Sequence, residues 1–265
     1  YKNIYTSFPM FNYPPSLVPA LKSSGFDIVS TANNHSLDRY SIGIDKTIKQ
    51  LNKYQLKFTG SKKADEPTNW YSITNKNGIR LAWLSCTQDT NGIKDHHQQI
   101  LYCYKKQHQK IILSLIKKLK NKVDGIIITP HWGTQYFHKP TNQQQVFAKK
   151  WLNAGALLIL GSHPHVIQPI KKYKTVDGRI TYIAYSLGNF VSNQGSLKNR
   201  TSGILAIKLT KNAGFTKIDS IKLHPTYMQN RGGKLNLEWI SSKKHSSYRL
   251  LQKVLGGSYL KIKNR

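Results

Sequence analysis

Histidine and asparagine side chains gather at three places in this 265-residue chain, each directly after a short apolar run. The six residues concerned are Asn33, Asn34, His35, His131, His163 and His165. Imidazole nitrogens and amide oxygens suit Zn, Mn, Fe or Ni better than Ca or Mg. A histidine can also act as a general acid or base near neutral pH. These residue types therefore predict a metal or catalytic site, provided that the chain brings the three places together.

The apolar runs 26–32, 125–130 and 157–160 are typical of short buried strands. Ligands of α/β sheets bind beyond the carboxyl ends of the strands. If the three strands are neighbours, four of the ten histidines meet in one cleft. One strand that ends in histidine is unremarkable, but three in one domain favour a shared site over three histidines of the core.

Helices and hairpins surround these strands. Helical periodicity or helix signals occur over 16–24, 42–54, 100–120, 142–153 and 246–255. Alternating patterns joined by turn residues predict hairpins of 70–74 with 79–86 and of 204–210 with 215–223. Strands that alternate with helices through the middle of the chain predict an α/β fold with a mixed sheet or two packed sheets.

The pair His163 and His165 offers two chemical possibilities and one structural alternative. In extended chain, residues i and i+2 point to the same side, roughly 7 Å apart. Two imidazoles so placed could hold one metal ion, or one each of two ions about 3.5–4 Å apart. The alternative is a polar loop in which the two histidines are neighbours by chance.

The charge is strongly positive, with 41 Lys and Arg against 11 Asp and Glu, a formal net charge of +30. Such a field favours polyanionic partners. The lysines are scattered, however, without an arginine stripe or a stacking motif, and solvated lysines explain the same numbers. We therefore do not expect a nucleic acid as the partner. Cys86 and Cys103 form no C-x-x-C pair or disulfide framework, and we expect Cys86 in the core.

Carboxylates that could bridge two metal ions are missing. None of the eleven acidic residues has a pattern that supports such a role. The chain also starts at Tyr1 rather than Met. Either it is a fragment that begins after the acidic residues, which the start favours, or a full dinuclear site has been lost.

Four segments together resemble one family in order and spacing over about 14–191. They are GFDIVSTANNHSLD (25–38), HWG (131–133), GALLILGSHPHVIQP (155–169) and YSLGNFV (185–191). The family is that of poly-γ-glutamate capsule biosynthesis (CapA-type) proteins, in the calcineurin-like metallophosphoesterase superfamily. The resemblance implies an α/β/β/α sandwich of two packed mixed sheets, here expected to lack its first strands. Gln135 departs from the family pattern, which usually has Glu there.

The resemblance also implies residue roles. Asn34 would be a metal ligand, His131 and His163 would bind one metal, and His165 would bind the other. His35 would contact the substrate oxyanion or protonate the leaving group. Asn33, Asp38 and Asn189 would support the site, although Asp38 could instead cap the next helix and Asn189 could belong only to a tight turn. Two divalent transition metal ions (Mn, Fe, Zn or Ni) would complete the full protein, and one or none this chain.

We therefore expect a metal-dependent, phosphoesterase-like hydrolase in the biosynthesis of a capsule or cell-envelope polyanion. The expected partners are an anionic polymer or phosphoester substrate and membrane-bound capsule synthesis components. A non-catalytic polyanion-binding or assembly component and a basic nucleic-acid-binding protein are the alternatives. We expect the extracytoplasmic face of the cell envelope as the location. The expected domains are residues 1–240 and a basic helical tail over 241–265.

Overall fold

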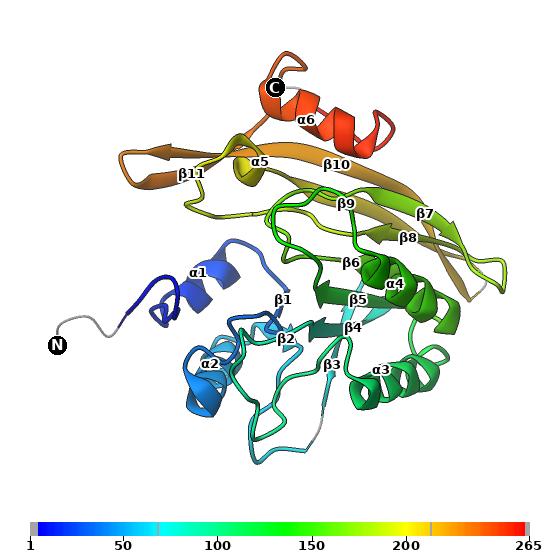
Figure 1. Ribbon diagram of the computed structural model, residues 1–265. Helices are drawn as coiled ribbons and strands as arrows, with labels where there is room; N and C mark the ends of the chain where they lie inside the picture. The colour runs from blue at the N-terminus through cyan, green and yellow to red at the C-terminus, as the bar shows by residue number, and fades with distance from the viewer. Residues whose placement is uncertain (1–4, 68, 213, 263–265) are drawn as a thin grey trace. The chain divides into compact units, whose positions relative to one another are not determined.

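The computed structural model describes residues 5–67, 69–212 and 214–262 (Figure 1). The chain divides into two compact units, Tyr1–His131 and Trp132–Arg265. Both units combine helices with strands in more than one sheet, so the fold is mixed α/β. The expected domain limits at 1–240 and 241–265 stay a prediction.

The first unit contains three helices and five strands among its described residues. They are α1 (Leu17–Ser23), β1 (Ile28–Ser30), α2 (Tyr40–Lys53), β2 (Lys57–Thr59), β3 (Tyr71–Lys76), β4 (Ile79–Thr87), α3 (Lys106–Leu119) and β5 (Gly125–His131). Strands β1 and β2 pair in parallel. Strand β4 pairs with β3 antiparallel and with β5 parallel, and its last residue, Thr87, lies opposite His131. The predicted hairpin is confirmed at Asn77 and Gly78, whose φ values of 52° and 75° suit a tight turn.

Apolar side chains of α2 hold the β1–β2 pair. Ile44 and Ile48 are buried in one cluster with Leu37, directly after the N-N-H segment. Leu51, on the next turn of the helix, is buried in a second cluster that includes Val29 of β1. Burying each such side chain contributes roughly 1.5–3 kcal/mol to folding. The segment 33–38 is therefore fixed between a strand and a helix that are both packed.

The second unit contains six strands and three helices among its described residues. They are α4 (Asn142–Ala154), β6 (Leu158–Leu160), β7 (Ile170–Lys174), β8 (Ile180–Ala184), α5 (Leu197–Arg200), β9 (Thr201–Asn212), β10 (Phe215–Arg231), β11 (Lys234–Trp239) and α6 (Ser246–Leu255). Strand β8 lies between β6, parallel to it, and β7, antiparallel to it. A separate antiparallel sheet has the order β11-β10-β9.

One apolar cluster joins these elements of the second unit. Its buried members come from the β7–β8 region, from β10 and from α6, and they are Ile167, Ile170, Ala184, Leu223, Leu251 and Leu255. Figure 1 shows α6 in red beside the long strand β10. The predicted helix over 246–255 is confirmed, with His245 accepting a hydrogen bond from the N–H of Ser247 at its start.

Several details differ from the sequence-based expectations. The helix expected over 100–120 begins only at Lys106, because Ile100 pairs with Ser61 and Tyr102 pairs with Thr87. Cys86 is buried in the core as expected, but the expectation of no disulfide was wrong, since Cys86 is bonded to Cys103. Strands β7 and β11 and the short α5 were not predicted. Residue 213, in the predicted turn of the β9–β10 hairpin, lies outside the described residues.

In the described part of the chain, the helices are too short or too polar to span a bilayer.

Candidate metal and catalytic site

The N-N-H segment forms a tight turn directly after β1. The side-chain oxygen of Asn33 accepts a hydrogen bond from the backbone N–H of His35 (2.8 Å), and the N–H of Asn33 is bonded to the hydroxyl of Ser36 (2.8 Å). The Ser36 hydroxyl also donates to the backbone oxygen of Thr31 (2.7 Å). Asn33 thus stabilises the turn through hydrogen bonds of its side chain and of its backbone N–H, as asparagine commonly does in turns.

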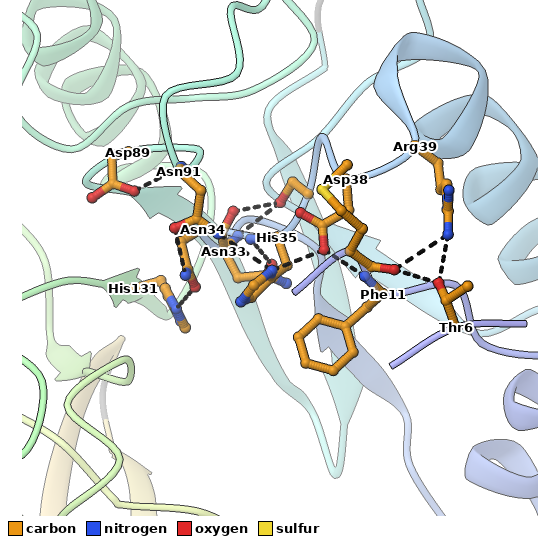
Figure 2. Close-up of polar contacts among 12 residues, drawn as sticks. Thr6, Phe11, Asn33, Asn34, His35, Asp38, Arg39, Asp89, Asn91 and His131 are labelled. Atoms are coloured by element: carbon orange, nitrogen blue, oxygen red, sulfur yellow. Dashed lines mark hydrogen bonds and ion pairs between the residues drawn. The ribbon is translucent and has the colours of Figure 1, made fainter. Parts of the chain in front are cut away.

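Asn34 and His131 meet at the carboxyl ends of two different strands (Figure 2). The side-chain oxygen of Asn34 lies 2.9 Å from Nε2 of His131. His131 ends β5, and its backbone oxygen accepts a hydrogen bond from the N–H of Gln88 (2.9 Å). Asn34 is only 5% exposed. Two atoms that commonly bind metals therefore point at each other from elements 97 residues apart.

Asp38 holds His35 rather than capping a helix. Its Oδ2 accepts hydrogen bonds from Nδ1 of His35 (2.8 Å) and from the backbone N–H of Phe11 (2.7 Å). The cap position of α2 is Arg39, and no side-chain hydrogen bond closes that helix end. Asp38 is 2% exposed and the His35 side chain 27%. The structure thus decides between the two roles that the sequence left open for Asp38.

This contact fixes which nitrogen of His35 carries the proton. A carboxylate only accepts, so Nδ1 must donate to Asp38. The neutral ring then has its lone pair on Nε2, and the protonated ring has an N–H there to donate. The ring of Phe11 packs edge-to-face on the imidazole, with centroids 4.6 Å apart. His35 is therefore oriented by a carboxylate on one side and an aromatic ring on another.

The sequence did not point to Asn91, a residue in the loop after β4. Its side-chain oxygen accepts a hydrogen bond from Nδ2 of Asn34 (2.9 Å). Its backbone N–H is bonded to the carboxylate of Asp89 (3.0 Å). The one local signal was the Asn91-Gly92 pair, which is typical of a turn and says nothing of the partner that the side chain reaches.

The second unit holds the other two predicted ligands, in a turn after β6. His163 and His165 have φ values of 98° and 59°, so both adopt the left-handed region. The expected extended geometry was wrong, because neither residue has the negative φ of an extended chain. Their ring centroids are 6.3 Å apart. Histidines at positive φ are uncommon, and such backbone strain occurs preferentially at functional sites.

Asn189 orients His165 in the same way as Asp38 orients His35. Its Oδ1 accepts a hydrogen bond from Nδ1 of His165 (2.8 Å), which leaves the lone pair of the neutral ring on Nε2. Its Nδ2 donates to the backbone oxygen of Asn199 (3.0 Å). The ring of Tyr136 stacks on the His165 imidazole at 5.7 Å. Asn189 thus does more than form the predicted tight turn.

Trp132 packs as a wall within the second unit. Its ring is fully buried and stacks on Trp151 at 5.4 Å, and its Nε1–H donates to the backbone oxygen of Tyr185 (3.0 Å). Burial raises the pKa of the Tyr185 phenol to about 12, so this side chain stays neutral. These aromatic groups support the turn rather than offer a reactive group.

The donor set fits a transition metal in type. Asn34 and His131 offer one amide oxygen and one imidazole nitrogen, and both His35 and His165 keep an oriented imidazole. In the parts of the chain that the structure describes, no three or more His, Cys, Asp or Glu side chains form a group that could hold a metal ion. The predicted meeting of His163 and His165 with Asn34 and His131 stays a prediction.

Sequence comparisons identify related proteins over most of this chain. Residues 1–194 match the family described as "Bacterial capsule synthesis protein PGA_cap". "PGA biosynthesis protein CapA" of Bacillus subtilis (strain 168) is 31% identical over 213 residues, which cover 78% of this chain and 53% of that protein. "Capsule biosynthesis protein CapA" of Bacillus anthracis is 31% identical over 217 residues, 78% of this chain and 50% of that protein. The chain thus spans about half the length of these curated relatives.

Solved structures give the fold. A putative 5'-nucleotidase from Staphylococcus aureus, in complex with alpha-ketoglutarate, has a TM-score of 0.53 at 14% identity. The match covers 90% of this chain and 44% of that one. The NAD nucleotidase of Haemophilus influenzae has a TM-score of 0.49 at 14% identity, over 94% and 45% of the two chains. The expected metallophosphoesterase-like α/β fold is confirmed.

Proposed function

Because this chain belongs to the family of bacterial capsule synthesis proteins, we propose that it is a metal-dependent, phosphoesterase-like hydrolase of capsule biosynthesis. The observation that carries this proposal is the 2.9 Å approach of Asn34 Oδ1 to His131 Nε2, beside an oriented His35. A hydrogen bond alone would explain why Asn34 and His131 are in contact. It would not explain why the buried carboxylate of Asp38 also holds the partly exposed imidazole of His35 in one orientation.

Asn34 and His131 are the proposed metal ligands of the first unit, and His163 and His165 those of the second. The proposed metal is a divalent transition ion, Mn, Fe, Zn or Ni, with two in the complete protein. A divalent metal in such a site supplies Lewis-acid polarisation of a phosphoryl oxygen. A metal ion at His131 would need the lone pair of Nε2, so the ring proton that Nε2 now donates to Asn34 would have to sit on Nδ1 instead.

His35 is the proposed catalytic residue. Asp38 keeps a proton on Nδ1, so Nε2 is the nitrogen that can donate a hydrogen bond or a proton when the ring is charged. A leaving-group oxygen next to Nε2 would receive that proton as its bond to phosphorus breaks. The buried carboxylate of Asp38 holds the ring plane in place, and the 27% exposure of His35 leaves one side open to a ligand.

The proposed polymer is an anionic cell-envelope polymer of the poly-γ-glutamate type, and a phosphoester is the proposed group that is cleaved. The net charge of +30 would attract either of them over a distance set by the ionic strength. The same charge favours a second candidate function, a polyanion-binding or assembly component of the capsule machinery that performs no hydrolysis. Membrane-bound capsule synthesis proteins are the proposed partners in both cases.

The proposed location is the extracytoplasmic face of the cell envelope. The Cys86–Cys103 disulfide supports it, because structural disulfides persist mainly in oxidising compartments. Labelling intact cells with a membrane-impermeant amine reagent tests this location. We expect the surface lysines to react before lysis, and reaction only after lysis would contradict the proposal.

Metal binding and hydrolysis together test the function. We expect the purified full protein to bind Mn²⁺ in a calorimetric titration and to hydrolyse an aryl phosphate when Mn²⁺ is present. His131→Ala should lose most of the affinity and the turnover, because it removes a ligand. His97→Ala is the matched control, an exposed histidine of the same unit, and should behave as the wild type.

The two candidate functions differ in one result. If a catalytic site exists, His35→Ala abolishes turnover while Mn²⁺ and polyanion binding persist, since His35 is not a proposed ligand. Polyanion binding without any Mn²⁺ binding or turnover in the wild type would refute the hydrolase and favour the binding component.

A further inference from the structure

The side chain of Asn34 has two chemically different ends, and each faces a different partner. Its Oδ1 lies 2.9 Å from His131 Nε2, and its Nδ2 donates to Oδ1 of Asn91 at 2.9 Å. Figure 2 shows Asn34 between Asn91 and His131, with a dashed line to each. We propose that Asn91 is a positioning residue that keeps the oxygen end of Asn34 directed at the proposed metal site; the inference rests on the proposed function.

The physical reason is that, among the described residues, the acceptor of the Asn34 amide nitrogen is the side-chain oxygen of Asn91. Asn34 is 5% exposed, so its N–H groups cannot rely on water. A buried donor without an acceptor costs about 1–3 kcal/mol. When the oxygen of Asn34 is given to a metal ion, its Nδ2 still needs an acceptor, and the side-chain oxygen of Asn91 supplies it. Groups that hold a metal ligand in this way typically change metal affinity by about 10–100-fold when they are removed.

Asn91 is itself held by a stiff loop. Its N–H is bonded to the Asp89 carboxylate (3.0 Å), and the neighbouring Thr90 donates to the backbone oxygen of Ile93 (2.7 Å). The loop ends are tied by the Cys86–Cys103 disulfide and by the hydrogen bond from the N–H of Cys103 to the oxygen of Thr87 (2.7 Å). A side chain on such a loop can hold its neighbour in one orientation.

The contact of Asn91 with His35 is a different kind of interaction. Nδ2 of Asn91 lies 3.3 Å from Nδ1 of His35, but that nitrogen already donates its proton to Asp38 at 2.8 Å. It cannot accept a second hydrogen bond in this state. The role that we assign to Asn91 therefore rests on its acceptor oxygen and Asn34 alone.

Backbone conformation dictates which variants can test the role. Asn91 and Gly92 have φ values of 52° and 80°, a left-handed pair that Gly and Asp tolerate well. Asn91→Gly removes the acceptor without straining the backbone. Asn91→Asp keeps an acceptor oxygen towards Asn34. Asn77, with a φ of 52° before Gly78, has the same local backbone in the exposed β3–β4 turn, so Asn77→Gly is the matched control.

The first experiment needs no metal. It records the side-chain amide signals of the ¹⁵N-labelled full chain by NMR, with the Asn34 pair identified by its loss in Asn34→Ser. We expect Asn91→Gly to shift this pair and to speed its exchange with water, and expect Asn77→Gly to leave it unchanged. Asn34 signals that stay unchanged in Asn91→Gly would overturn the proposal.

The second experiment titrates the same chains with Mn²⁺ in a calorimeter. We expect Asn91→Gly to weaken Mn²⁺ binding at least about tenfold. Asn91→Asp should restore the affinity, and Asn77→Gly should match the wild type. Wild-type affinity in Asn91→Gly would overturn the positioning role while the hydrolase proposal stands. No Mn²⁺ binding by the wild type would refute the proposed metal site, and the metal-free signals of Asn34 would still decide whether Asn91 positions it.

Discussion

The N-N-H turn of the first unit (residues 33–35) and the H-P-H turn of the second (residues 163–165) both orient histidine side chains after a strand, but they do so by different means. Each turn follows a three-residue strand of a parallel pair, β1 with β2 and β6 with β8. In the N-N-H turn, side-chain hydrogen bonds to Asp38, Asn91 and His131 hold the reactive groups. In the H-P-H turn, the backbone conformation also sets the direction of the side chains, because both histidines have positive φ values.

The two turns are therefore sensitive to different substitutions. Side chains held by a polar network depend on every partner, including those on distant loops such as Asn91. Side chains directed by an unusual backbone conformation depend on the local turn. A single substitution to glycine can relieve the backbone strain of such a turn. Both turns nevertheless share one device, an acceptor on Nδ1 that leaves Nε2 free: Asp38 for His35 and Asn189 for His165.

Removing the Cys86–Cys103 disulfide should have the largest effect, because it releases the loop that carries Asn91, a partner of the N-N-H turn. The loop spans 17 residues, and its release should lower the free energy of unfolding by about 3 kcal/mol. Denaturant unfolding of Cys86→Ser/Cys103→Ser followed by circular dichroism measures this. A reducing agent should destabilise the wild type but not the double variant. Equal stability of the two proteins without reducing agent would show that the disulfide does not stabilise the fold.

Asp38→Ala should come next. It removes the acceptor for His35 and for the N–H of Phe11, and at roughly 1 kcal/mol per hydrogen bond we expect a loss of about 2 kcal/mol. Asp27→Ala is the control, since its contact with Lys76 at 3.9 Å is an exposed ion pair of little value. Thermal unfolding of both variants checks the prediction. If Asp27→Ala lost as much stability as Asp38→Ala, the hydrogen bonds of Asp38 would contribute no more than an exposed ion pair does.

Glycine and alanine variants should respond with opposite signs in the two turns. At His163, with its φ of 98°, glycine relieves strain that alanine retains, so His163→Gly should be more stable than His163→Ala by about 1 kcal/mol. Asn34 has no positive φ, and there Asn34→Ala should be the more stable variant. The same order at both positions in denaturant titrations would remove the distinction between a backbone-held and a side-chain-held turn.

The smallest effect concerns pH and a histidine outside both turns. Burial, and then the charge of Lys105, lower the pKa of His108, whose Nδ1 accepts a hydrogen bond from the N–H of Tyr102 (3.0 Å). The unfolded chain therefore binds a proton at a higher pH than the folded chain does. Stability from this group is fully present above about pH 6.5 and is lost as the pH falls below that value.

His108→Asn keeps an acceptor for Tyr102 and removes the titrating ring. Its stability should fall less steeply than that of the wild type between about pH 7 and pH 5. Urea titrations at several pH values measure the slope. Identical slopes would assign the acid sensitivity to groups other than His108.

The sequence was most informative where a local pattern decides the structure. The alternating residues around Asn77-Gly78 and the helix Ser246–Leu255 were predicted closely, since a tight turn and an amphipathic face are encoded by neighbours in the chain. The strand end at His131 was also predicted. The approach of Asn34 to His131 joins the ends of strands that lie in two different sheets, β1 beside β2 and β5 beside β4, and the repeated strand-and-histidine pattern could not fix this arrangement.

The remaining features depend on contacts that are distant in the sequence or on backbone conformations. Cys103 lies in a stretch with helical periodicity, and its pairing with Cys86 and the strand-like contacts of Tyr102 overrode that periodicity. The positive φ values of His163 and His165 are backbone conformations that the residue types of this segment do not indicate. Asn91 carries no motif, and only the folded loop shows which side chain it reaches.

The most direct test of the proposed metal site is anomalous diffraction from crystals of the full protein soaked in Mn²⁺. We expect an anomalous peak within bonding distance of both Asn34 Oδ1 and His131 Nε2, with the side-chain nitrogen of Asn34 still bonded to Asn91. A peak elsewhere with an intact Asn34–His131 hydrogen bond, or no peak at saturating Mn²⁺, would contradict it.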